Sequence, residues 1–128
     1  MRKALARGIV ITLNVALLPG IVTAQEIPEA LRQNMPYSEA RELLLHEGWL
    51  TRYRDLSQKD KLTGLLGRMV NELGYPEFQD CSGTGAGFCR AWFGDGYGQR
   101  LTLITVNNQE EPILFRWWVE EEPEEEPE

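Results

Sequence analysis

The chain has 128 residues, of which 13 are Lys or Arg and 20 are Asp or Glu, giving a formal net charge of −7. This length allows one small domain, and the excess of acidic side chains argues against a nucleic-acid partner, whose binding requires clustered Lys and Arg. The acidity is concentrated at the end of the chain, where the nine-residue segment EEEPEEEPE contains seven acidic residues. Residues 120–128 are therefore predicted to form a disordered acidic tail.

Residues 1–24 have the pattern of a secretory signal peptide. Three basic residues precede an apolar run from Gly8 to Leu18, and the segment ends in the small residues Val-Thr-Ala. The apolar run is shorter than the roughly 20 residues that a membrane-spanning helix needs, and a retained anchor is the alternative. We expect cleavage before Gln25, an exported chain without a later transmembrane segment, and a periplasmic or secreted location.

The first helix is predicted at residues 37–47, after a polar lead-in at 25–34. Pro36 suits a helix start, and Gly48 suits the position just after a helix end. Residues 48–54 could continue as a short extended segment. The helix places four apolar residues on one face at a spacing of 3.6 residues, namely Tyr37, Ala40, Leu43 and Leu44.

A second helix is predicted to begin at the capping-like segment 57–60 and to run to about residue 73. Gly74 ends the pattern, and Tyr75-Pro76 prevents its continuation. Gly64 and Gly67 weaken this helix, although their lack of side chains could allow close packing on a neighbour. Its apolar stripe comprises Leu62, Leu65, Leu66, Met69, Val70 and Leu73.

Three strands follow, at residues 88–93, 101–106 and 113–119, separated by glycine-rich or polar turns. Helices followed by a β-meander predict an α+β fold, in which two N-terminal helices pack on one face of a three- to four-stranded antiparallel sheet. Residues 35–119 should form this single domain.

The two cysteines, Cys81 and Cys89, bracket a glycine-rich run of seven residues. Tetrahedral zinc needs four ligands, a redox motif brings the cysteines closer together, and a P-loop has a different glycine and lysine pattern. An exported chain meets an oxidising compartment, so a disulfide is predicted.

Strand alternation assigns side chains to the two faces of the sheet. The face covered by helices should contain Cys89, Ala91, Phe93, Ile113, Phe115, Trp117 and Val119. The opposite face should present Phe88, Arg90, Trp92, Leu114, Arg116 and Trp118. The middle strand is apolar on both sides, so its facing stays open, and Thr102 and Ile104 could join this face.

An open sheet face is normally polar, whereas Trp and Arg are typical of interface hot spots. Arg90, Trp92, Arg116 and Trp118 are therefore the candidate binding face. Two alternatives remain. Residues 48–56 or the lead-in could cover this face as a second core, or the arginines could stack on the tryptophans without a partner.

No catalytic constellation is identifiable. His46 is the only histidine, and it lies off the apolar face of the first helix. Serine or cysteine catalysis needs a base beside the nucleophile, and the serines have no such motif around them. We expect no enzyme activity, no cofactor and no metal.

Two stretches, MPYSEARELLLHEGW (35–49) and YPEFQDCSGTGAGFCRAWF (75–93), resemble a group of small exported bacterial proteins. That group shares the patterns Y-x-x-A-R-x-x-L-L-x-x-G-W and C-x-G-T-G-x-x-x-C-R. The resemblance implies a bacterial exported domain and carries no assigned activity. The element order is also similar to the beta-lactamase inhibitory protein domain, which by itself implies no function. The matching residues are Tyr37, Ala40, Arg41, Leu44, Gly48, Trp49, Cys81, Gly83, Thr84, Gly85, Cys89 and Arg90.

These features together predict a binding or interaction module of the bacterial cell envelope, whose partner is another envelope protein. A structural or assembly-assisting domain without a dedicated ligand is the second hypothesis, and a small secreted enzyme is the third. The pattern leaves the oligomeric state open.

Overall fold

The computed structural model describes residues 25–83, 85–108 and 110–124, so the predicted signal peptide lies outside the described residues. The predicted α+β fold is confirmed: short helices precede an antiparallel sheet, which has five strands. The helices are α1 (Tyr37–Glu47), η2 (Leu56–Lys61), α2 (Gly64–Gly67) and η3 (Arg68–Glu72). The strands are β1 (Leu50–Thr51), β2 (Phe78–Cys81), β3 (Phe88–Gly94), β4 (Gln99–Val106) and β5 (Ile113–Glu121).

Helix α1 has the predicted bounds, between Pro36 and Gly48. Tyr37, Ala40 and Leu44 are buried along one face. The helix ends at Gly48, whose φ of 104° lies in the left-handed region that favours glycine. The Gly48 N–H donates to carbonyl oxygens of the last turn, so this end of the helix is capped by the backbone itself.

The second predicted helix is broken into three pieces. The Asp55 side chain accepts a hydrogen bond from the Ser57 N–H at 2.9 Å and caps a separate 3₁₀ helix, η2. The backbone is then extended at Leu62 and Thr63 before α2 begins. The prediction of one continuous helix is wrong, because Leu62 and Thr63 have extended backbone between the pieces. Gly67 lies close to this link: a Cβ on Gly67 would lie 2.6 Å from the Leu62 carbonyl oxygen.

The sheet has the order β1-β3-β4-β5, and β2 pairs with β3 on the same edge as β1. The two short strands therefore share one side of β3: β1 lies beside Phe93 and Gly94, and β2 lies beside residues 89–91. Strand β2 was not predicted, because FQDC is only four residues long and has no apolar alternation.

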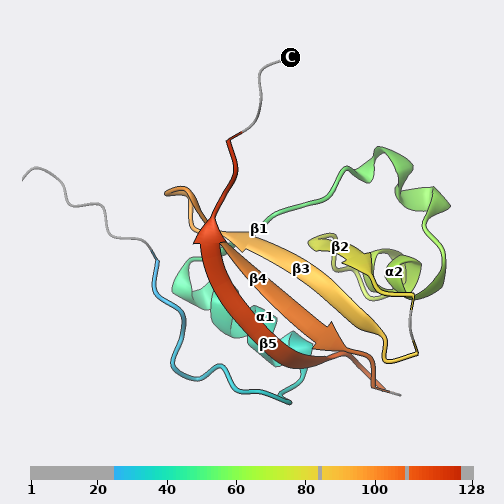
Figure 1. Cartoon of the computed structure of the whole chain (residues 1–128), viewed down its shortest axis with the longest axis horizontal. Helices are drawn as coiled ribbons and strands as arrows, with labels where there is room; N and C mark the ends of the chain where they lie inside the picture. The colour runs from blue at the N-terminus through green and yellow to red at the C-terminus, as the bar shows by residue number, and fades with distance from the viewer. Residues whose placement is uncertain (1–24, 84, 109, 125–128) are drawn as a thin grey trace, which may run out of the picture.

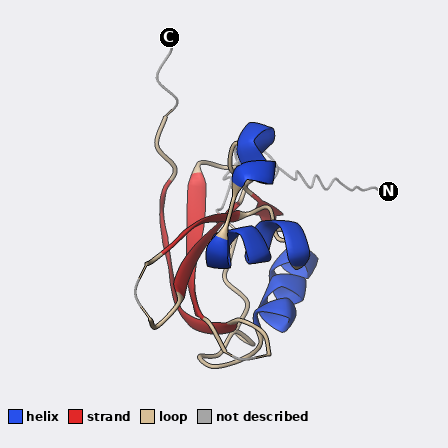
Figure 2. Ribbon diagram, turned by 90° about the vertical axis from the view of Figure 1, so that its right-hand side faces the viewer, coloured by secondary structure: helices blue, strands red, loops and turns tan. Residues whose placement is uncertain are grey.

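The helices lie on one side of the sheet and leave the other side bare (Figures 1 and 2). The lead-in also packs on the helix side and is less polar than expected, because Leu31 is buried in the core, as is Met35 just after the lead-in. It adds to the edge of β5, where the Asn34 N–H donates to the Leu114 carbonyl oxygen at 2.7 Å. The core comprises Leu31, Met35, Tyr37, Ala40, Leu44, Trp49, Met69, Val70, Phe78, Cys89, Ala91, Phe93, Leu101, Leu103 and Leu114.

The covered side also holds a fully buried carboxylate, Glu77, which directly precedes β2. Arg41 donates to it from Nε at 2.6 Å and from Nη2 at 3.3 Å, and the Tyr37 hydroxyl donates at 2.7 Å. The guanidinium of Arg41 also lies 5.2 Å from the centre of the Tyr75 ring. The Tyr and Arg of the Y-x-x-A-R pattern are thus one turn apart on α1 and bind the same carboxylate.

The predicted disulfide is confirmed between Cys81 and Cys89. The two cysteines are direct register partners on β2 and β3, with Cα atoms 4.0 Å apart. The disulfide therefore closes the glycine-rich hairpin between these strands.

Strand β5 extends beyond the expected domain end at residue 119. Glu120 accepts a hydrogen bond from Arg100 at 2.9 Å, and Glu122 accepts one from Arg52 at 2.8 Å. The prediction that the tail begins at residue 120 is wrong for residues 120–122, because residues 120–121 belong to β5 and Glu122 is bound to Arg52. Residues 125–128 lie outside the described residues.

Candidate functional site

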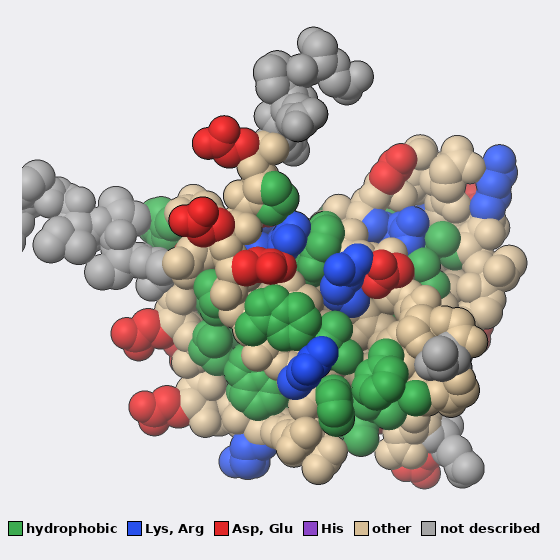
Figure 3. Space-filling model, in the orientation of Figure 1, with side chains coloured by type: hydrophobic (Ala, Val, Ile, Leu, Met, Phe, Trp, Pro, Cys, Tyr) green, Lys and Arg blue, Asp and Glu red, His purple; other side chains and the backbone are tan. Residues whose placement is uncertain are grey.

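The side of the sheet away from the helices, here called the open face, carries the four predicted site residues in two neighbouring rows. Strand register places Arg90, Ile104 and Arg116 in one row across β3, β4 and β5. The next row contains Trp92, Thr102 and Trp118. Figure 3 looks onto this face and shows hydrophobic side chains gathered over the sheet, with basic groups among them.

A β-bulge changes which residues of β5 reach the open face. Thr105 pairs with Leu114, whereas Ile104 pairs with Arg116, so Phe115 is the extra residue on β5. The predicted facing of Leu114 is therefore wrong, because Leu114 is fully buried in the core. The expected burial of Phe115 in the covered face is wrong as well, because its ring packs 5.4 Å from that of Phe88. The expected facing of Ile113 toward the helices is wrong for the same reason, because Ile113 pairs with Val106, which pairs with Phe88 on the open face.

On the Trp92 side of the open face, the charged groups are paired within the chain, while the buried Trp92 Nε1–H has no hydrogen-bond partner among the described residues. The guanidinium of Arg100 lies 3.9 Å from the centre of the Trp92 ring, and that of Arg90 lies 5.3 Å away. Both arginines are paired in turn, Arg100 with Glu120 and Arg90 with Asp80. The Trp92 ring is thus half-buried beneath cations that already have carboxylate partners, and Arg–Trp stacking without a partner describes this half of the face.

Glu120 is held in place by its neighbours. It accepts hydrogen bonds from the Arg100 guanidinium at 2.9 Å and from the Thr102 hydroxyl at 3.0 Å. These contacts, with that of Arg100 foremost, hold the pKa of the Glu120 carboxyl below its usual value. Glu120 is therefore an ionised partner for Arg100 at neutral pH.

The other half of the open face, around Arg116 and Trp118, is more exposed to solvent. Trp118 is 38% exposed, and Arg116 is exposed beside it, with its guanidinium 5.5 Å from the centre of the Trp118 ring. Arg116 makes no hydrogen bond or ion pair with the described residues. This exposed guanidinium is therefore available for charge-assisted hydrogen bonds to a carboxylate supplied by another molecule.

None of the described segments covers this half of the face. Residues 50–51 form β1 at the edge of β3. The lead-in lies on the helix side, where the Trp49 indole Nε1–H donates to the Glu26 carbonyl oxygen at 3.0 Å. The two segments expected to form a second core therefore lie elsewhere.

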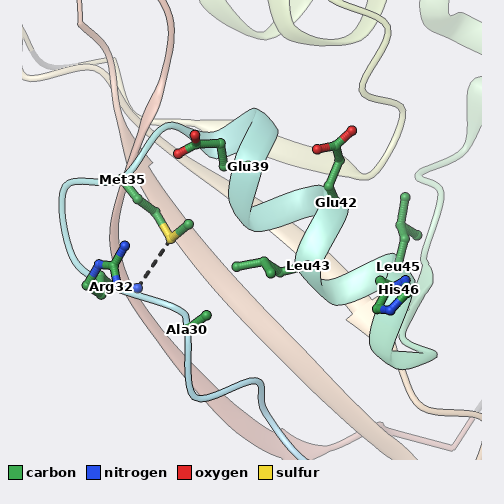
Figure 4. Close-up of a pocket in the computed structure, with 8 residues that line it drawn as sticks. All are labelled: Ala30, Arg32, Met35, Glu39, Glu42, Leu43, Leu45 and His46. Carbon is green, nitrogen blue, oxygen red and sulfur yellow. Dashed lines mark hydrogen bonds between the residues drawn. The ribbon is translucent and has the colours of Figure 1, made fainter.

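The predicted exposure of His46 agrees with the structure, and the residue lies at a surface groove between α1 and the lead-in. The groove has a volume of about 860 Å³ and is lined by Ala30, Arg32, Met35, Glu39, Glu42, Leu43, Leu45 and His46. Figure 4 shows the carboxylates of Glu39 and Glu42 pointing away from the His46 ring. The groove thus brings acidic groups and a histidine to one surface without joining them as an acid–base pair.

Among the described residues, no three side chains of His, Cys, Asp or Glu form a group able to hold a metal ion. The same part of the chain contains no helix long and apolar enough to cross a membrane.

Comparison of the chain with protein-family models, curated proteins and solved structures gives no match. The resemblance to exported bacterial proteins stays a prediction, and function is inferred from the geometry of this chain.

Proposed function

We propose that the protein is an exported interaction module of the bacterial cell envelope. It binds an extended segment of another envelope protein on the Arg116–Trp118 half of the open face. The observation that carries this proposal is the exposure of an unpaired arginine beside an exposed tryptophan, on a sheet face that no described segment covers.

The chemistry of the face defines the partner. The guanidinium of Arg116 offers charge-assisted hydrogen bonds to a carboxylate. Around it, Trp118, Ile104 and Phe115 offer partly exposed apolar surface. We therefore infer a partner segment in which an Asp or Glu is flanked by aliphatic or aromatic residues. Trp and Arg are the side chains most enriched among residues that dominate binding energies.

Site-specific photo-crosslinking in living cells tests this proposal. A photoreactive amino acid replaces Trp118 in one variant and Leu45 in a matched control, since Leu45 is similarly exposed, at 40%, on the helix side. We expect position 118 to crosslink to one protein, through a segment that contains Asp or Glu. Crosslinks of equal pattern from both positions would contradict the proposal, and a crosslink to a second copy of this chain would replace it with self-association.

Charge exchange then tests the chemistry. In the purified complex, Arg116→Glu should weaken binding by roughly 10- to 30-fold, the range of a hot-spot contact. Replacing the partner's acidic residue with Arg should restore affinity only in the Arg116→Glu background. Unchanged affinity of Arg116→Glu would exclude this half of the face as the binding site.

A further inference from the structure

The turn between β3 and β4 holds a buried carboxylate that has no basic partner among the described side chains. Asp95 is only 6% exposed. Its Oδ1 accepts hydrogen bonds from the backbone N–H groups of Tyr97 at 2.6 Å and Gln99 at 3.0 Å. Among the described residues, its Oδ2 accepts only from the backbone nitrogen of Gln25, at 3.3 Å, a contact that spans 70 residues of sequence.

The backbone of Gln25 and Glu26 is fixed from a second direction. The Trp49 indole donates to the Glu26 carbonyl oxygen at 3.0 Å, and this indole is fully buried. The side chain of Gln25 lies against Gly48, where an added Cβ would lie 3.2 Å from the Gln25 Oε1. The contacts with Trp49 and Gly48 therefore place the Gln25 nitrogen beside Asp95 independently of its hydrogen bond to the Asp95 carboxylate.

Residue 25 is also the predicted first residue after signal-peptide removal. We propose that the α-amino group created by this cleavage binds Asp95, so that the β3–β4 turn is a built receptor for the protein's own mature amino terminus. Before cleavage the Gln25 nitrogen is a neutral amide. After cleavage it is an ammonium group, and it gives the buried carboxylate the countercharge that it otherwise lacks.

The state of Asp95 suits this role. Burial alone would raise the pKa of its carboxyl, but the hydrogen bonds from the backbone N–H groups of Tyr97, Gln99 and Gln25 lower it below the usual value. The group is thus an anion at neutral pH, and the ion pair forms without a further proton transfer.

Docking also protects Gln25 from a known reaction of amino-terminal glutamine. In cyclisation, the neutral α-amine attacks the side-chain carbon Cδ, a new N–Cδ bond forms, and the amide nitrogen leaves as ammonia. An amine that is protonated and paired with Asp95 is a poor nucleophile, and the Gln25 side chain lies against Gly48. The mature protein should therefore keep an uncyclised Gln25.

The test uses the full chain, exported with its own leader and purified from the periplasm. Intact mass should place the amino terminus at uncyclised Gln25. At neutral pH, the α-amine should react with an acylating reagent at least about tenfold more slowly than in Asp95→Asn, equivalent to one pKa unit of stabilisation of the ammonium form. Lys59 and Lys61, both exposed, are internal references. Glu26→Gln is the matched control, because it removes a neighbouring carboxylate without touching the turn, and it should change the rate by less than about twofold.

A second variant keeps Asp95 intact in case Asp95→Asn disturbs the turn. One alanine inserted before Gln25 moves the amine outward by one residue and returns the Gln25 nitrogen to an amide. Its amine should react as fast as that of Asp95→Asn. Equal rates in the native and extended chains, rapid cyclisation of native Gln25, or cleavage at another residue would each overturn the proposal. These outcomes are independent of whether the open face binds a partner.

Discussion

Arg41 and Arg116 lie on opposite sides of one sheet and differ in what surrounds the guanidinium. Arg41 is bound at two nitrogens by the fully buried Glu77 and lies over the Tyr75 ring. Arg116 lies over the Trp118 ring and has no carboxylate partner among the described residues. A guanidinium fixed by a buried carboxylate is part of the fold, whereas one that is stacked but unpaired is available to a partner.

Trp117 and Trp118 show the same difference at adjacent positions of β5. Trp117 pairs with Leu103 and packs against the core, whereas Trp118 pairs with Thr102 on the open face and is 38% exposed. On the covered side, aromatic and charged groups therefore stabilise the fold. On the open side, groups of the same kinds stay accessible to solvent. The predictions below test this division.

The largest expected effect is on the covered side. Glu77→Ala leaves the guanidinium of Arg41 and the Tyr37 hydroxyl without their shared carboxylate, and loss of one partner from a buried pair costs about 3–5 kcal/mol. Urea denaturation measures the change. Asp80→Ala is the control, because it breaks the exposed Asp80–Arg90 pair of the open face, and it should cost less than about 1 kcal/mol. Equal losses for the two variants would contradict the division.

The second prediction concerns the attachment of β2, the strand that Glu77 precedes. Cys81→Ser combined with Cys89→Ser removes the bond between β2 and β3. In the chain-entropy model, closing a loop of this size contributes about 2.5 kcal/mol, so the variant should lose about that much in urea denaturation. The wild type in reductant should fall to the same level. Two free thiols in the denatured, unreduced wild type would contradict the bond.

The third prediction compares the adjacent tryptophans directly. Trp117→Ala should cost about 2 kcal/mol, below the range for a fully buried Trp, because Trp117 is only half-buried. Trp118→Ala should stay within about 0.5 kcal/mol of wild type, as is usual for surface substitutions. Melting of the two variants under identical conditions measures the difference. Equal and large destabilisation would mean that the open face is buried, and the proposed binding face would fail.

Local patterns predicted much of this architecture. Pro36 and Gly48 gave the two ends of α1, and apolar, β-prone runs between glycine-rich or polar turns located β3, β4 and β5. The break in the second helix was not predicted, because the apolar stripe keeps its helical spacing across Leu62 and Thr63, where the backbone is extended. The spacing shows which side chains face the core and does not show where the backbone leaves the helix.

The candidate site was predicted in its composition and only partly in its geometry. Alternation counts residues along one strand, so it could not detect the bulge at Phe115, which moves Leu114 into the core. It also could not show that Arg100 lies on Trp92, since Arg100 precedes the predicted start of its strand. Glu77 was missed because no local pattern marks a charge as buried. The sequence feature that could have indicated a buried carboxylate was the pair of Tyr37 and Arg41. These two donors lie one turn apart on α1 and both bind Glu77.

The smallest expected effect concerns the Tyr37 hydroxyl, which donates to Glu77 at 2.7 Å. Tyr37→Phe removes this hydrogen bond but leaves Glu77 paired with Arg41, so the loss at neutral pH should be about 1.5 kcal/mol.

Burial, and then the charge of Glu77, raises the pKa of the Tyr37 hydroxyl above its usual value. The folded protein therefore retains a proton that the unfolded chain releases above about pH 10. Stability from this group is complete below that pH and is lost as the pH rises further. Urea denaturation between neutral pH and about pH 11 should thus show a steeper alkaline loss for the wild type than for Tyr37→Phe. The exposed Tyr53 provides the control, because Tyr53→Phe should keep the wild-type slope. A Tyr37→Phe slope that is indistinguishable from the wild type would mean that this hydroxyl is not buried against Glu77, and the contrast between the two sides of the sheet would then rest on Arg41 alone.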